Sequence, residues 1–451
     1  MGWGDPDPMF DGWAELDWRE RRERRCRRWL EAPGVAFADA ATRQKYRDRV
    51  QLLIDAISLK KPARVPVTAW SGFFVPRYSG LTPGEAMRDY QKMGAALVRY
   101  HEDFRPDVQA GPVAPAGVFE LLGLEMVDWP GRGLSDETPW QYREGEYMHA
   151  GDYDALIADP EGYFRRVLLP RFGSAFAPLA GLNPFTDFME AASMPFQLLP
   201  FADPALVEGV RRLADAAREA LAWLAASREA GADVSARLGI PPEIAGSVKA
   251  PYDVLADTLR GMRGIARDLL QRPDKLLEAA KRLVAPMVSL GTRQAAWSPS
   301  PLVVFWLHKG ADGFMSDEQF RTFYWPTLKA VLAGLIEEGV VPLLFAQGSY
   351  LSRLDVIADG DLPSGSVLWA FDQTDMATAG AKLGGYACIA GNVPTALLTL
   401  GTPAEVEKYV TGLLEACAGR GGFVLRSGSA LDDARPENLA AMFETGRRWE
   451  G

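Results

Sequence analysis

The chain has 451 residues, of which 48% are hydrophobic and 24% are charged, as is usual for a soluble globular protein. Its 59 acidic and 49 basic residues give a net charge of −10, which does not favour binding to nucleic acid or to an anionic membrane. Three cysteines, no signal pattern at the N-terminus and no apolar run of 18 residues exclude a disulfide framework and a membrane span, so we expect a cytoplasmic protein.

The N-terminal region is expected to be helical. Residues 15–31 predict a helix that carries seven arginines, and residues 41–59 predict another. Two interpretations of the arginine-rich helix stay open. It is either a solvated helix with Glu–Arg pairs along its surface, or a docking surface around Arg24 for an acidic partner protein. We therefore expect a helical extension over residues 1–60, followed by one domain over residues 61–451.

The first half of that domain is less regular. Leucines and valines at three- and four-residue spacing predict a helix within residues 202–229, and further helices are expected at residues 83–101 and 260–296. Strand-like segments begin at residues 65 and 107. Residues 239–257 resemble a strand that leads into a loop at the top of a barrel. Residues 120–200 are rich in Gly, Pro and aromatic residues and predict no regular element.

From residue 301 the pattern becomes regular. Five short apolar runs alternate with helical segments: PLVVFWLH, VVPLLFAQ, SVLWAFD, YACIAGN and GFVLRSGS. Almost continuously apolar strands that alternate with helices indicate a parallel sheet that is buried on both faces. Five successive units of this kind favour a closed α/β fold, the (β/α)₈ or TIM barrel, over an open sheet.

Each apolar run ends abruptly in polar residues. In a (β/α)₈ barrel the active site lies where the strands end, so these residues are expected on one rim. They are His308, Lys309, Gln347, Ser349, Tyr350, Asp372, Asp375, Asn392, Arg426, Ser427 and Ser429.

His308 is the first candidate catalytic residue. A histidine can act as a general acid or base near neutral pH, and Asp312 lies close enough in sequence to fix its tautomer. The competing interpretation is a structural hydrogen bond at the barrel rim. Asp372 is a second candidate acid, whereas Asp375 is better explained as the cap of a helix that begins near Met376.

The remaining candidates have weaker assignments. Tyr350 could protonate a leaving alkoxide or simply line the pocket. Arg426 is expected to pair with Asp372, with a substrate anion or with another internal carboxylate. Asn392 would brace the loop that contains Pro394. Cys388 lies in the middle of a strand and is expected in the core rather than as a nucleophile.

Several segments resemble a known family. ARVPVTAWSGFF, SDEQFRTFYWPTLKAVLAGLIEEG, GNVPTALLTLGTPAEV and GGFVLRSGSALDDARPENLAAM are similar to the uroporphyrinogen decarboxylase superfamily, which includes cobalamin-dependent methyltransferases. The similarity runs with gaps from about Arg64 to the C-terminus, and it implies a (β/α)₈ barrel.

The sequence departs from both catalytic patterns of that superfamily. Phe345, Gln347 and Ser429 occupy the positions at which the methyltransferases hold their zinc ligands, so we predict no metal at this site. The arginine-rich segment that grips porphyrinogen carboxylates is also missing. Around Trp70 the chain is apolar, with only Arg77 as a candidate carboxylate ligand. Haem biosynthesis is therefore not expected.

The resemblance implies a methyltransferase that moves a methyl group between a corrinoid (cobalamin) on a partner protein and a largely apolar or aromatic small molecule, without zinc. The expected catalytic residues are His308, Asp372 and Tyr350. The expected substrate-binding residues are Trp70, Arg77, Lys309, Gln347, Asn392, Arg426 and Ser429.

Two alternatives stay open. One is a metal-free decarboxylase or lyase that holds a small carboxylic acid with Arg77, Lys309 and Arg426. The other is a non-catalytic second subunit of a multi-protein methyltransferase, docked through the helix near Arg24.

Overall fold

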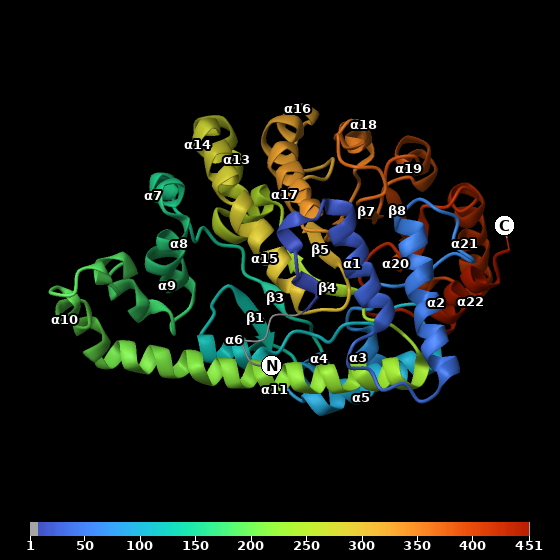
Figure 1. The fold of residues 1–451 in the computed structure, drawn as a ribbon, viewed down its shortest axis with the longest axis horizontal. Helices are drawn as coiled ribbons and strands as arrows, with labels where there is room; N and C mark the ends of the chain where they lie inside the picture. Colours follow the sequence, from blue (N-terminus) through green and yellow to red (C-terminus); the bar gives the residue numbers. More distant parts are fainter. Residues whose placement is uncertain (1–7, 451) are drawn as a thin grey trace.

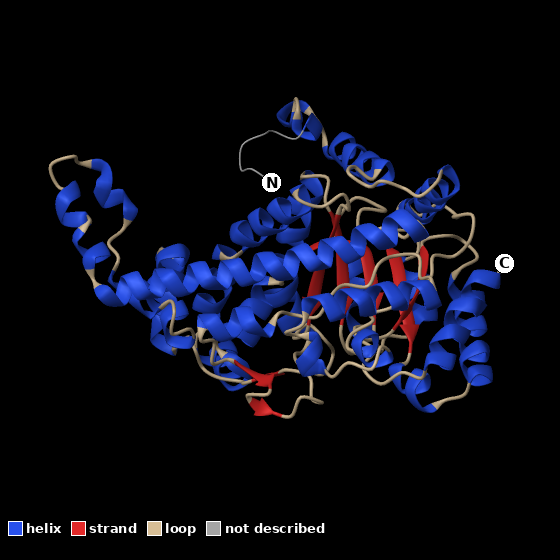
Figure 2. Cartoon of the chain, turned by 90° about the horizontal axis from the view of Figure 1, so that it is seen from below, coloured by secondary structure: helices blue, strands red, loops and turns tan. Residues whose placement is uncertain are grey.

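The computed structural model describes residues 8–450, so residues 1–7 of the expected N-terminal extension and residue 451 lie outside the described part. Its centre is a six-stranded parallel sheet with the strands in sequence order (Figure 2). The strands are β4 (Ile244–Val248), β5 (Leu302–Leu307), β6 (Val341–Ala346), β7 (Leu368–Phe371), β8 (Cys388–Val393) and β9 (Phe423–Ser427).

Two extended segments near residues 67 and 108 complete the sheet. Thr68 N donates to Leu425 O of β9 (2.9 Å), and Val67 O accepts from Asp107 N (3.0 Å). Gln109 N then donates to the carbonyl of Pro241, just before β4 (2.9 Å). These bonds join β9 to β4 through two further strand positions. The eight positions form the closed (β/α)₈ barrel that the sequence predicts.

Alternate residues of each strand face the barrel interior, because successive side chains of a strand point to opposite faces. Val304 of β5 and Leu343 of β6 belong to the core inside the barrel. Their neighbours Val303 and Leu344 belong to the core between the strands and the outer helices. Burial on both faces explains why these strands are apolar throughout.

The outer helices follow the strands around the barrel (Figure 1). After β4 come α13 (Gly261–Gln271), α14 (Pro273–Arg282) and α15 (Val284–Ala296), where the sequence predicted one interrupted helix. The later helices are α17 (Trp325–Glu337), α18 (Leu354–Ala358), α19 (Met376–Leu383), α20 (Thr395–Leu400), α21 (Pro403–Cys417) and α22 (Pro436–Arg448). No helix within residues 8–450 combines the length and apolar character needed to cross a bilayer.

The N-terminal helices α1 (Trp18–Glu31) and α2 (Ala40–Ile57) pack against the barrel. Trp29 and Tyr46 join the core inside the barrel, together with Leu302 and Val341 at the beginnings of β5 and β6. The two helices therefore cover the N-terminal end of the barrel and leave the opposite end for the site.

Several arginines of α1 bind the chain's own backbone. Arg25 donates to the carbonyls of Ala295 (3.2 Å) and Glu338 (2.8 Å), and Arg28 donates to Ala296 O (3.0 Å). These carbonyls lie at the C-terminal ends of α15 and α17, where a helix has unpaired acceptors and a partial negative charge. Arg25 and Arg28 are therefore anchored to the barrel, whereas Arg19 and Arg27 of the same helix are exposed. For the exposed face of α1 the solvated surface and the docking surface both stay predictions.

The irregular region forms a small sheet and an extended arm. The sheet contains β1 (Val127–Pro130), β2 (Gly133–Leu134) and β3 (Gln141–Tyr142). Short helices α7 (Tyr153–Ala158), α8 (Pro160–Tyr163), α9 (Leu169–Phe172) and α10 (Met194–Gln197) lead to α11 (Pro204–Leu238). Helix α11 has 35 residues, longer than predicted, and ends at Gly239, whose positive φ of 63° suits glycine. Figure 1 shows α10 at one extreme of the molecule.

Candidate active site

The strand register brings the polar strand ends together. Leu307 pairs with Ala346, and Ala346 pairs with Phe371, so the next residues His308, Gln347 and Asp372 leave their strands at one level. This arrangement agrees with the expected rim at the C-terminal ends of the strands.

Two carboxylates after β4 hold the His308–Lys309 dipeptide. Asp253 ends the short helix α12 (Pro251–Asp253), and its carboxylate accepts hydrogen bonds from the backbone N–H groups of His308 (3.1 Å) and Lys309 (2.9 Å). Asp257 lies in the π-helical turn that follows. Its Oδ2 lies 2.6 Å from His308 Nδ1, and its Oδ1 lies 3.2 Å from Lys309 Nζ. Residues 253–257 thus hold both the backbone N–H groups and the side chains of His308 and Lys309.

The charges of the site keep Asp257 ionised. Burial raises the pKa of this carboxyl, but the hydrogen bond from His308 and the positive charges of Lys249 and Lys309 outweigh it, so the pKa lies well below its ordinary value. Because an ionised carboxylate only accepts, Nδ1 of His308 must carry the proton. Nε2 makes no hydrogen bond within the described residues, and His308 lines a cavity.

The pKa of Asp253 is shifted in the opposite direction from that of Asp257. Its side chain is fully buried, and burial together with the nearby Asp257 charge raises its pKa. The hydroxyl of Tyr324 donates to Asp253 Oδ2 at 2.7 Å. Asp253 is therefore placed to position His308 and Lys309 rather than to meet a ligand.

A cavity of about 490 Å³ opens at this end of the barrel. One side consists of strand-end residues, including His308, Lys309, Gln347 and Asp372, all four of which the sequence analysis selected. The opposite side comes from the segment around the small sheet. Apolar lining comes from Met126 and Tyr142 of that segment, from Met262 of α13 and from Phe314 in the loop after β5. Burial raises the pKa of Asp372 in this setting.

Sequence reasoning missed Asp257 and Lys249. The segment 239–257 was expected at the top of the barrel, but nothing in its pattern distinguished these two residues. One signal was available. Asp257 follows a predicted strand, and a chain with only three histidines offers few partners for such a carboxylate, so a contact with His308 could have been considered.

Three aromatic rings pack together in the core inside the barrel, and none of them lines the cavity. Trp70 lies 5.1 Å from Phe345 and 5.3 Å from Trp306, and Trp306 lies 5.5 Å from Phe345, measured between ring centroids. Phe345 stands at a position for which the family resemblance implies a zinc ligand, and a phenyl ring offers no donor. Within residues 8–450 no group of three or more His, Cys, Asp or Glu side chains could hold a metal ion. These residues do not fit zinc.

Three predicted binding residues lie below or beside the cavity. Arg426 is buried in the barrel, where it forms an ion pair with Glu243 rather than with Asp372 and lies 4.3 Å from the centre of the Trp70 ring. The side-chain amide of Asn392 donates to the carbonyl of Asp372 (3.1 Å), so it braces the loop after β7 rather than the loop of Pro394. None of Arg426, Trp70 and Asn392 lines the cavity.

Other expected placements are wrong. Tyr350 is fully buried near Trp369, outside the cavity, and burial raises its pKa well above the ordinary value. Arg77 pairs with Asp433. Ser429 is half-buried after β9 and does not line the cavity.

Two nearby acids have structural partners. Asp312 does not contact His308, because its carboxylate accepts hydrogen bonds from Ser349 Oγ (2.7 Å) and Ser352 Oγ (2.9 Å). Asp375 caps α19 by accepting from Thr378 N (2.8 Å), as the sequence indicated. Cys388 is fully buried inside the barrel.

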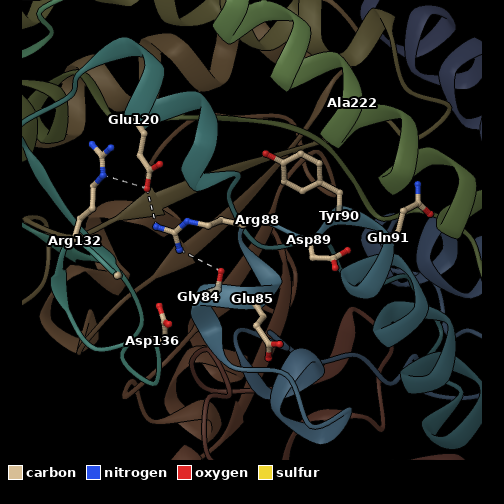
Figure 3. A pocket seen from close by; sticks show the side chains of 11 residues that line it. Gly84, Glu85, Arg88, Asp89, Tyr90, Gln91, Glu120, Arg132, Asp136 and Ala222 are labelled. Atoms are coloured by element: carbon tan, nitrogen blue, oxygen red, sulfur yellow. Dashed lines mark hydrogen bonds and ion pairs between the residues drawn. The ribbon is translucent and has the colours of Figure 1, made fainter.

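A second hollow of about 860 Å³ lies at the surface, over α4 (Pro83–Ala86) and the start of α5 (Tyr90–Phe104) (Figure 3). Two of its arginines share one carboxylate. Arg88 binds Glu120 at 2.7 Å, and Arg132 lies 3.8 Å from the same carboxylate. No strand-end residue of the barrel lines it, so we place the candidate site at the barrel mouth.

A closed (β/α)₈ barrel with titratable groups gathered at the C-terminal ends of its strands defines an enzyme of the TIM-barrel class. Residues 191–449 match the family model described as uroporphyrinogen decarboxylase (URO-D), and the chain belongs to this family. No curated protein matches the chain.

The fold is similar to that of a solved structure. A methyltransferase from Methanosarcina mazei has 15% sequence identity and a TM-score of 0.59, over 89% of this chain and 98% of that chain. A B12-independent methionine synthase from Shewanella sp. W3-18-1 has 7% identity and a TM-score of 0.30, over 45% of this chain and 59% of that chain. Only the first likeness is close enough to describe the barrel as a whole.

Proposed function

We propose that this protein is a methyltransferase that moves a methyl group between a corrinoid, carried by a partner protein, and a largely apolar or aromatic small molecule. Family membership and the fold of the Methanosarcina methyltransferase support the reaction type. The observation that carries the proposal is the His308–Asp257 pair, which faces a cavity with an apolar side.

His308 handles the proton at the atom that loses or gains the methyl group. When a methyl group leaves an oxygen atom, that oxygen acquires negative charge, and a proton at Nε2 of His308 can neutralise it. In the reverse direction Nε2 takes the proton from the hydroxyl. Asp257 keeps the ring oriented through Nδ1, as a carboxylate does for a catalytic histidine.

The two lysines stabilise the same oxygen. Lys249 and Lys309 share one carboxylate, with Nζ–oxygen distances of 3.2 Å each, so one positive charge remains uncompensated within this group. A developing phenolate or alkoxide is stabilised by such a charge in a partly buried site. This role replaces the metal that zinc-containing relatives use.

The corrinoid would remain on its carrier. A cavity of about 490 Å³ suits a drug-sized molecule and not a corrin macrocycle with its side chains. When bound, the corrinoid supplies a cobalt atom that accepts or donates the methyl group. The residues of this chain hold the small substrate, orient it toward the mouth and move the proton.

Visible spectroscopy of the corrinoid tests the proposal. The purified protein is mixed with cob(I)alamin and a panel of methoxylated aromatic compounds, and the conversion to methylcobalamin is recorded. We expect turnover with at least one compound and a loss of about 100-fold or more in His308→Ala. His149→Ala, at an exposed position, is the matched control. No conversion with any compound, in the presence of a corrinoid protein as well, would refute methyl transfer.

A metal-free decarboxylase or lyase of a small carboxylic acid is the second candidate. The uncompensated charge of Lys249 and Lys309 favours it, because a substrate carboxylate would bind there. Arg77 and Arg426, which were expected to help, are paired elsewhere. Release of CO₂ from small aromatic acids measures this activity. The third alternative is a non-catalytic subunit docked through α1. Arg25 and Arg28 bind helix ends of this chain, so a partner would have to meet the exposed Arg19 and Arg27.

A further inference from the structure

Residues 185–210, which we call the apolar arm, expose a cluster of large apolar side chains. The arm comprises two 3₁₀ helices, α10 and the first turns of α11. Figures 1 and 2 show it projecting from the end of α11, away from the barrel. The nine exposed side chains are Phe185, Met189, Met194, Phe196, Leu198, Leu199, Phe201, Val207 and Val210.

The exposed area is that of a protein interface. Phe185, Met189 and Phe196 are 71%, 87% and 67% exposed. If large side chains present about 150–250 Å² each, the nine together leave roughly 1,000 Å² accessible. The largest apolar patch on a typical monomer is about 300–600 Å². A standard interface buries about 800 Å² on each partner. The arm therefore exposes more apolar surface than a lone chain usually does.

The charges of the arm disfavour a lipid surface. Residues 173–210 contain no lysine or arginine, whereas they contain Asp187, Glu190, Asp203 and Glu208. Helices that lie on anionic membranes carry basic residues on their polar face. A protein surface is the better partner.

A second copy of the chain can supply that surface. Other exposed large apolar residues, such as Leu270, Trp297 and Leu400, lie on separate elements and form no comparable cluster within the described residues. A head-to-tail contact needs two different complementary patches, whereas a two-fold contact needs one patch that meets itself. We propose that the apolar arm packs against the same arm of a second copy and makes the protein a two-fold symmetric dimer.

Like charges do not prevent this pairing. Glu208 forms an ion pair with Arg211 (2.7 Å), and Asp203 caps the N-terminus of α11. Asp187 and Glu190 remain, and both can stay in water at the rim of the contact. Helix α11, about 50 Å long at 1.5 Å per residue, holds the arm away from the barrel.

Multi-angle light scattering after size-exclusion chromatography tests the dimer. At about 20 μM we expect the wild-type chain at twice its 49.4 kDa mass. Phe185→Ser combined with Phe196→Ser should give the monomer mass, with an unchanged circular dichroism spectrum. Leu270→Ser, at an exposed leucine (81%) on α13, is the matched control and should remain dimeric.

A cross-link provides an independent readout that needs no loss of apolar surface. Met189→Cys should form a disulfide-linked dimer under oxidising conditions, above the level that the native cysteines give in the wild-type chain. A monomeric wild-type protein would overturn the proposal. The same holds if the monomer binds vesicles of neutral or anionic lipid through the arm. A dimer that survives both serine substitutions would also overturn it.

Discussion

The Nδ1 atom of His308 lies 2.6 Å from Oδ2 of Asp257, although the two residues are separated by 51 positions and follow different strands of the barrel. The contact leaves Nε2 as the ring atom available to a ligand. It joins a residue at the end of β5 to the π-helical turn after β4, so the neighbouring βα units act as one site.

Replacing Asp257 should impair catalysis more than binding. Asp257→Asn leaves the shape of the site but removes the carboxylate that accepts from Nδ1 and orients the ring, so we expect kcat to fall by about 100-fold or more. Steady-state kinetics with the best substrate of the corrinoid assay measures the change. Asp312→Asn is the control, because Asp312 binds Ser349 and Ser352 instead of His308. Equal kcat in the wild type and Asp257→Asn would exclude this role.

Removing the hydroxyl of Tyr324, which donates to Asp253, should lower the stability of the fold. In Tyr324→Phe the buried carboxylate loses a donor at 2.7 Å, and we expect a loss of about 1–3 kcal/mol in the free energy of unfolding. Urea denaturation measures the loss. Tyr252→Phe is matched, since Tyr252 is also buried and its ring packs 5.7 Å from Tyr324, but its hydroxyl makes no hydrogen bond within the described residues. If both variants lose the same stability, the hydrogen bond to Asp253 is not the cause.

The aromatic cluster of Trp70, Trp306 and Phe345 inside the barrel should be needed for stability and should not bind metal. Phe345→Ala removes a buried ring between Trp70 and Trp306, and a deletion of this kind costs about 3–5 kcal/mol in unfolding free energy. Elemental analysis of the wild-type protein should find no stoichiometric zinc, and a chelator should leave activity unchanged. One zinc per chain that is lost together with activity would contradict this prediction.

The pH dependence of stability should carry a contribution from His101. Burial lowers the pKa of His101 from 6.5 to about 4 in the folded chain, despite a hydrogen bond from Nδ1 to Leu97 O. Below pH 6.5 the unfolded chain takes up a proton that the folded chain does not. This contribution to stability is therefore complete above pH 6.5 and is lost as the pH falls toward 4, by about 3 kcal/mol in total.

Urea denaturation at several pH values between 7 and 4 measures that loss. His101→Gln should reduce the dependence on pH, whatever its effect on stability at pH 7. His149→Gln, at an exposed position, should keep the wild-type dependence. The same slope in His101→Gln and in the wild type would show that another group is responsible.

The sequence by itself determined the barrel and half of its site. Runs such as LVVFWL and VPLLFA, each closed by polar residues, predict buried parallel strands because both of their faces must be apolar. The strand-end rule then selects His308, Gln347 and Asp372, which line the cavity. The absence of zinc donors also follows from residue types alone, since a phenyl ring cannot coordinate a metal.

Only the tertiary structure decided which groups meet. The partner of His308 is Asp257 and not the nearby Asp312, and the partner of Arg426 is Glu243, 183 residues away. Periodicity records which face of an element is buried, but it does not record which distant side chain that face contacts. Those pairings depend on the register of the strands and on the closure of the barrel, and both are properties of the whole chain.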